Sequence, residues 1–65
     1  MKMSYFEDTD TLYIELCDSE VAETKGLNAN TYLDLDPEGN VIAITVEHAS
    51  TRADLRKVTL TGIAV

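Results

Sequence analysis

The sequence contains a single cysteine, and this scarcity excludes several classes of protein. Cys17 has no partner for an internal disulfide, and one thiol cannot build the four-thiolate sites that hold zinc or iron–sulfur clusters. A reducing compartment suits such a chain, so we expect a cytoplasmic protein. Carboxylates flank the cysteine in the sequence and disfavour the thiolate form, which predicts an inert thiol.

Basic residues are also few. Five lysines and arginines stand against twelve acidic residues, which gives a net charge of -7. Binding to a DNA backbone requires basic side chains that displace counterions, so nucleic acid is not expected as a partner. The imbalance is uneven, because residues 1–47 hold two lysines against eleven carboxylates (net -9), whereas residues 48–65 hold three basic residues against one acid (net +2).

Long hydrophobic runs are missing as well. No segment reaches the roughly 18 uninterrupted apolar residues of a membrane helix, and the first residues do not resemble a signal peptide, so we expect no membrane association. With 65 residues, of which 45% are apolar, the chain is long enough for one domain, 1–65, with a thin core.

Apolar residues that alternate with other residues predict β-strands in several segments. The predicted strands are Lys2 to Phe6, Thr11 to Cys17, Val21 to Lys25, Thr31 to Asp36 and Val41 to Val46, with a further alternation over 58–61. The sequence Asp36 to Asn40 predicts a hairpin turn between the strand that begins at Thr31 and the strand that begins at Val41. In this turn proline suits the first turn position and glycine suits a left-handed position.

A short helix is predicted from Thr51 to Lys57. Thr51 offers an N-cap hydroxyl, Asp54 follows three positions later, and basic residues suit the helix C-terminus. Together these elements predict an α+β fold, a small antiparallel β-meander of about four to five strands with one short C-terminal helix.

Five short stretches of the sequence form a recognisable combination. They are Met1-Lys2-Met3 with Tyr5, Asp8 to Ile14, Val21 to Thr24, Asp34 to Asn40, and Ala49-Ser50 followed by Arg52. With this combination the chain resembles the small bacterial family known as domain of unknown function 2283, over about residues 1–52. The resemblance implies a compact β-meander with a C-terminal helix and no known activity, and it suggests a role in neutralising a toxin-like partner. His48 departs from the family pattern and inherits no role.

Known catalytic and metal-binding motifs fit the sequence poorly. The run Asp34-x-Asp36-x-Glu38-Gly39 matches the first half of a calcium loop, but position 12 falls on Thr45 and the next segment is a predicted strand. His48 is the only histidine, and no motif joins it to Cys17 or Ser50 as a nucleophile. Acidic pairs such as Asp8 with Asp10 suit solvated turns better than a hydrolytic cleft. We therefore expect no catalytic residue, no bound metal and no cofactor.

Apolar surface exceeds what the predicted helix can cover. Seven helical residues span about 10 Å, whereas three strands carry eight aliphatic residues on their inner faces. The outer faces also carry Tyr13, Cys17, Tyr32, Val41 and Ala43. This surplus predicts a homodimer or another oligomer.

The leading functional hypothesis is a non-enzymatic protein interaction module that neutralises a small basic or toxin-like partner. The alternative is a minimal metal-dependent hydrolase with a composite site at a dimer interface, built from Asp8, Asp10, His48 and neighbouring carboxylates. A third interpretation is an assembly component of a larger complex. The predicted interaction surface consists of Tyr13, Glu15, Tyr32, Asp34, Val41 and Ala43.

Overall fold

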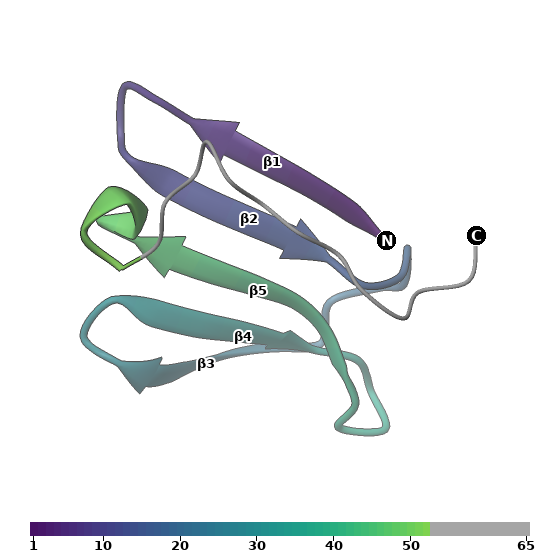
Figure 1. The fold of residues 1–65 in the computed structure, drawn as a ribbon. Helices are drawn as coiled ribbons and strands as arrows, with labels where there is room; N and C mark the ends of the chain where they lie inside the picture. Colours follow the sequence, from purple (N-terminus) through teal and green to yellow (C-terminus); the bar gives the residue numbers. More distant parts are fainter. Residues whose placement is uncertain (53–65) are drawn as a thin grey trace.

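The fold is one open antiparallel sheet of five strands followed by a single 3-10 turn (Figure 1). The structure is a computed structural model, and it describes residues 1–52. No helix in that part of the chain has the length and apolar character needed to cross a membrane. The elements are β1 (Lys2–Phe6), β2 (Thr11–Glu15), β3 (Glu23–Asn28), β4 (Thr31–Leu35), β5 (Val41–Glu47) and η1 (Ala49–Thr51).

The predicted meander is wrong in its strand order, although the antiparallel sheet itself is confirmed. The order is β1-β2-β5-β4-β3, so β5 separates β2 from β3 (Figure 1). The composition of the strands explains this order. The sequence of β5, VIAITVE, is mostly apolar and includes two buried residues, whereas β3, ETKGLN, is exposed throughout. The apolar strand gains most from a central position, and a polar strand tolerates an edge.

The predicted helix over Thr51 to Lys57 has no counterpart in the described residues. They contain only the 3-10 turn η1, which ends at Thr51, where the helix was expected to begin. Residues 53–57 and the predicted strand at 58–61 lie outside the described part of the chain. The α component of the fold is therefore limited there to one turn, and the described fold is essentially all β.

The predicted hairpin at Asp36 to Asn40 is confirmed. Gly39 has φ 85°, the left-handed conformation that glycine adopts without a steric penalty. Asp36 closes the turn with its side chain, because its Oδ1 accepts the Glu38 N–H at 3.0 Å and the Asn40 N–H at 2.8 Å. The hydrogen bonds from Asn40, above all from its backbone, hold the pKa of the Asp36 carboxyl below its usual value.

Two glycines allow a matched prediction on stability. We expect Gly39→Ala to lower the free energy of unfolding by about 1–2 kcal/mol, because an alanine strains the left-handed backbone. Gly26→Ala should raise it by about 0.4–1 kcal/mol, because the added Cβ meets the Tyr32 ring at an ordinary 4.0 Å and the unfolded chain loses freedom. Urea unfolding of both variants measures these values, and equal effects would contradict the conformational argument.

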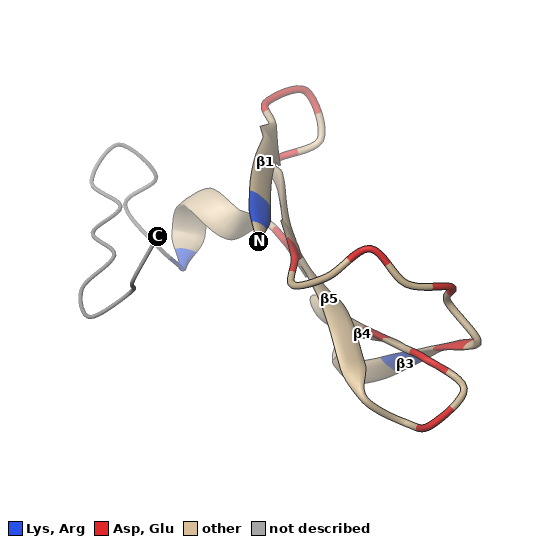
Figure 2. Ribbon diagram, turned by 90° about the vertical axis from the view of Figure 1, so that its right-hand side faces the viewer, with Lys and Arg blue, Asp and Glu red and all other residues tan. Residues whose placement is uncertain are grey.

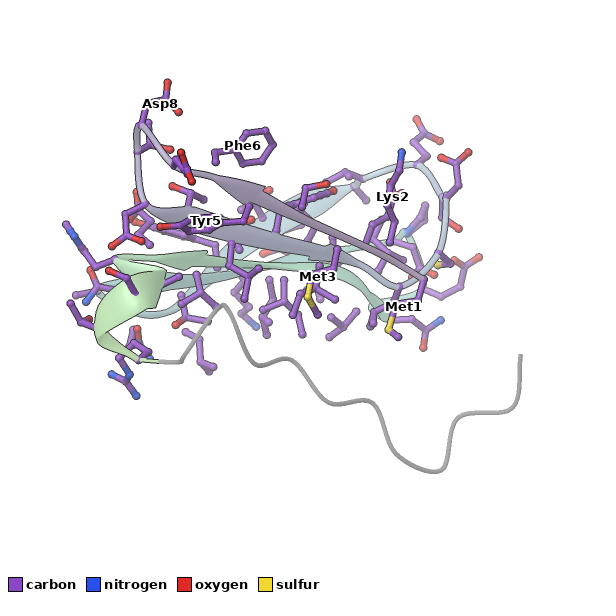
Figure 3. All side chains as sticks on the ribbon, turned by 45° about the horizontal axis from the view of Figure 1, so that its top comes forward. Met1, Lys2, Met3, Tyr5, Phe6 and Asp8 are labelled. Carbon is purple, nitrogen blue, oxygen red and sulfur yellow. The ribbon has the colours of Figure 1, made fainter. Side chains whose placement is uncertain are left out.

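One face of the sheet is mainly aliphatic. The register aligns Met3, Ile14, Ile44 and Leu33 across four strands, and Leu12 with Val46 in the neighbouring row. Met3 lies on the opposite side of β1 from Lys2 and Phe6 (Figure 3). We call this surface the aliphatic face.

Candidate interaction face

The opposite side of the sheet carries most of the predicted interaction residues. The register of the four strand pairs arranges this side as three parallel rows that cross the strands. We call it the tyrosine face. Its upper row is Phe6, Thr11 and Glu47, its middle row is Ser4, Tyr13, Thr45, Tyr32 and Gly26, and its lower row is Lys2, Glu15, Ala43, Asp34 and Thr24.

The two tyrosines share the middle row, with Thr45 between them. Tyr13 on β2 and Tyr32 on β4 are each directly opposite Thr45 on β5, so their backbones are two strand spacings apart, about 9–10 Å. Both residues are half-buried. The face therefore presents two aromatic side chains on either side of a small central residue.

The hydroxyl of Tyr13 lies in a negative environment. Desolvation raises its pKa first, and the charges of Glu15 and Asp34 raise it further. These carboxylates belong to strands on opposite sides of β5, which places the Tyr13 hydroxyl within the influence of both. The hydroxyl therefore stays protonated at neutral pH and is available as a hydrogen-bond donor.

Tyr32 has a different carboxylate neighbour. The charge of Glu47 raises the pKa of the Tyr32 hydroxyl most, and a hydrogen bond to the same carboxylate adds to the effect. The ring extends towards the sheet edge, because a Cβ on Gly26 would lie 4.0 Å from its Cδ1 and Cε1. Gly26 thus leaves room for the ring above β3, an arrangement in which an aromatic side chain covers an edge glycine.

The lower row places two carboxylates around a small residue. Glu15 and Asp34 are both opposite Ala43, whose exposed fraction is only 2%. The Asp34 carboxylate also accepts a 2.8 Å hydrogen bond from the Thr24 hydroxyl, which fixes one side of the row. Ala43 therefore forms the floor of the face and is too buried to make extensive contacts itself.

Val41 differs from the other five predicted surface residues. A register shift after Asp34 pairs Leu35 with Val41 instead of Ile42. Such a bulge interrupts the alternation of side chains along a strand. Val41 is 37% exposed and lies opposite a residue of the other face, so the regular alternation of the tyrosine face ends at Ala43.

Acidic residues also concentrate in the loops around the sheet. Figure 2 shows acidic residues in the β1–β2 loop, in the connection from β2 to β3 and in the β4–β5 turn, with few basic residues among the described elements. Cys17 lies in the second of these segments and is exposed, with its Sγ 3.6 Å from the Ser19 hydroxyl. Acidic residues therefore lie both on the tyrosine face and in the loops around the sheet.

Asp10 organises a second polar cluster at one end of the sheet. Its carboxylate accepts hydrogen bonds from the Tyr5 hydroxyl, from the Ser50 N–H at 3.1 Å and from the Ser50 hydroxyl at 2.7 Å. Its carbonyl accepts the Ala49 N–H at 3.0 Å. Both Asp10 and His48 have left-handed backbones, with φ 53° and 55°. We call this cluster the Asp10 clasp, because it joins the β1–β2 loop to η1.

The clasp brings together only part of the predicted hydrolase site. His48 lies near enough for its charge to lower the pKa of Asp10, but the Tyr5 and Ser50 hydrogen bonds lower that pKa more. Asp8 projects from the tip of the β1–β2 loop (Figure 3). A carboxylate with a lowered pKa is a weak general base. Within residues 1–52, no group of three or more histidine, cysteine or acidic side chains has a metal-binding arrangement.

The comparisons with known proteins give one result. Neither a curated protein nor a solved structure matches the chain. A model of the family described as "Protein of unknown function (DUF2283)" matches residues 2–50, which include all five strands. The chain therefore belongs to the DUF2283 family.

Proposed function

We propose that this protein is an acidic interaction module whose tyrosine face binds a basic segment of a partner protein. The observation that carries the proposal is the middle row of the sheet, in which Tyr13 and Tyr32 flank Thr45 on one face. Three carboxylates, those of Glu15, Asp34 and Glu47, lie on the same face.

The chemistry of this face suits lysine and arginine side chains. Tyrosine rings attract cations and bury apolar area at a low cost in side-chain entropy. The surrounding carboxylates form charge-assisted hydrogen bonds with ammonium and guanidinium groups. The net charge of -7 draws a basic partner towards the face and raises the association rate.

A small basic or toxin-like protein is the partner that we propose. Neutralisation would consist of covering the basic surface of that protein with the tyrosine face. The acidic character of residues 1–47 supports this assignment. In the same proposal the module acts as a homodimer.

A titration with a hexa-arginine peptide tests the binding face. We expect nuclear magnetic resonance shifts to concentrate on the Tyr13 and Tyr32 rows, with affinity that decreases as salt increases. Glu15→Gln should weaken binding about two- to five-fold, because it removes one surface ion pair. Glu38→Gln removes the same charge from the β4–β5 turn and should change the affinity by less than about two-fold, because Glu38 lies away from the tyrosine face.

The charge-matched pair decides the outcome. Equal losses in the two variants would show that the peptide responds only to net charge and would contradict binding at the tyrosine face. Shifts confined to the acidic loops would contradict it as well.

No specific observation favours the metal-dependent hydrolase. The Asp10 carboxylate oxygens already accept hydrogen bonds from Tyr5 and Ser50, and Asp36 uses both of its oxygens within its own turn. Calorimetric titration with magnesium, manganese, calcium and zinc salts tests this alternative. Stoichiometric binding of any of these ions would revive it.

A further inference from the structure

The described sheet has two edges of different character. β3 forms one edge, and its sequence ETKGLN contains two charged residues, a glycine and a register shift between Gly26 and Asn28. Charges and bulges of this kind are the usual means by which proteins prevent an edge strand from pairing with another chain. The β3 edge is therefore protected.

The β1 edge has fewer of these protective features. Its sequence KMSYF has one charge, no proline and no glycine, and its register with β2 is unbroken over five residue pairs. Three of its larger side chains are exposed, with exposed fractions of 41% for Met3, 38% for Tyr5 and 50% for Phe6. An edge strand this apolar and regular is suited to pair with a further strand.

We propose that β1 pairs antiparallel with β1 of a second copy of this chain, in a register centred on Ser4. The sequence of β1 is complementary to itself in this register. Lys2 comes opposite Phe6 of the second copy, and Met3 comes opposite Tyr5 of the second copy. Ser4 faces its own equivalent on the two-fold axis, as an isologous contact requires.

Each cross-strand pair in this register is favourable. Lys2 and Phe6 lie on the tyrosine face, where the ammonium group can contact the aromatic ring of the other chain. Met3 and Tyr5 lie on the aliphatic face, where a thioether and an aromatic ring attract each other. Symmetry repeats both pairs, so four attractive side-chain pairs surround the central serines. In a parallel pairing in register, Lys2 would instead face Lys2.

This dimer gives a specific interface to the homodimer of the proposed function, on which it rests, whereas peptide binding by the tyrosine face does not require it. The two-fold axis of an antiparallel pair within a sheet is perpendicular to that sheet, so both copies present their tyrosine faces on the same side. The two Tyr13 residues are then three strand spacings apart, about 14 Å. A partner with two basic segments gains avidity from such a paired surface.

Opposite charges at Phe6 provide a sharp test. With Phe6→Lys, the introduced lysine faces Lys2 of the other copy, and we expect sedimentation velocity to show the monomer at concentrations where the wild type is dimeric. With Phe6→Glu, the introduced carboxylate faces the same lysine, and the dimer should persist. If repulsion between the net charges of the two copies controlled dimerisation, the glutamate variant would dissociate more than the lysine variant. The net charge is -7 in the wild type, -6 in the lysine variant and -8 in the glutamate variant.

Cross-linking tests the register. In a Cys17→Ser background, Ser4→Cys should form a disulfide-linked dimer under mild oxidation, because the two introduced thiols meet on the axis. Glu23→Cys places the thiol on the exposed β3 edge and should remain mostly uncross-linked.

Three results would overturn the proposal. The first is a wild-type chain that is monomeric at every concentration, which would mean that β1 does not pair with a second copy. The second is the same degree of dimerisation in Phe6→Lys and Phe6→Glu. The third is cross-linking of Glu23→Cys in preference to Ser4→Cys. None of these results bears on peptide binding by the tyrosine face, which Glu15→Gln tests separately.

Discussion

Ile42→Ala is expected to lower the free energy of unfolding by about 2–5 kcal/mol, through the loss of buried aliphatic contacts and the cavity that remains. Ile42 has an exposed fraction of 3% and is the only large side chain among the buried residues of the described range 1–52. A chain of this length is stabilised by only about 3–10 kcal/mol in total. We therefore expect this variant to be substantially unfolded at 37 °C, as measured by circular dichroism and urea denaturation.

Val41→Ala is the matched control for this prediction. Val41 is the preceding residue of β5 and is 37% exposed, so its truncation should cost well under half as much as that of Ile42. A similar loss of stability in the two variants would show that the bulge in β5, and not the burial of Ile42, determines the sensitivity of this strand.

Asp10→Asn is expected to have the largest effect among single substitutions in the polar clusters. The carboxylate of Asp10 accepts three hydrogen bonds, and two of them come from Ser50, 40 residues away. An amide has one acceptor oxygen, so at least one of the hydroxyl donors loses its partner. We expect a clear decrease in the thermal midpoint at pH 7 and faster amide exchange in η1. Ser50→Ala should give a smaller decrease.

The effect of Asp10 should depend on pH in a defined direction. Its folded-state pKa is lower than the ordinary value of 3.8, so its contribution to stability is fully present above that value and is lost as the pH falls through the folded-state pKa. The difference in thermal midpoint between the wild type and Asp10→Asn should therefore be largest near neutral pH and should shrink below pH 3.8. A constant difference down to pH 2 would contradict a role for the ionised carboxylate.

Local patterns in the sequence predict the local elements of this fold well. Lys2–Phe6 is predicted with the observed bounds, and the Asp36 to Asn40 turn has the glycine conformation that its sequence favours. β3 begins two residues later than predicted, at Glu23, because its polar sequence marks its start weakly. Each of these features depends on residues close together in the chain.

Long-range features could not be predicted in the same way. Nothing in the pattern around Asp10 indicates that Ser50 is its partner, because the link depends on the pairing of β2 with β5. The same pairing overturns the meander order. The bulge beside Leu35 also departs from simple alternation, which is why Val41 fits the predicted surface less well than Tyr13 and Tyr32. Alternation alone did place those two tyrosines on one face.

The central position of β5 has a consequence for how the sheet assembles. β5 is the last of the five strands to leave the ribosome, and it pairs Thr11 with Glu47, 36 residues later. Before residue 41 is made, the chain contains only two hairpins that have no strand between them, and isolated hairpins are marginally stable. The domain therefore cannot form progressively from its N-terminus. Its folding must wait for β5, and it should then proceed as a single cooperative step.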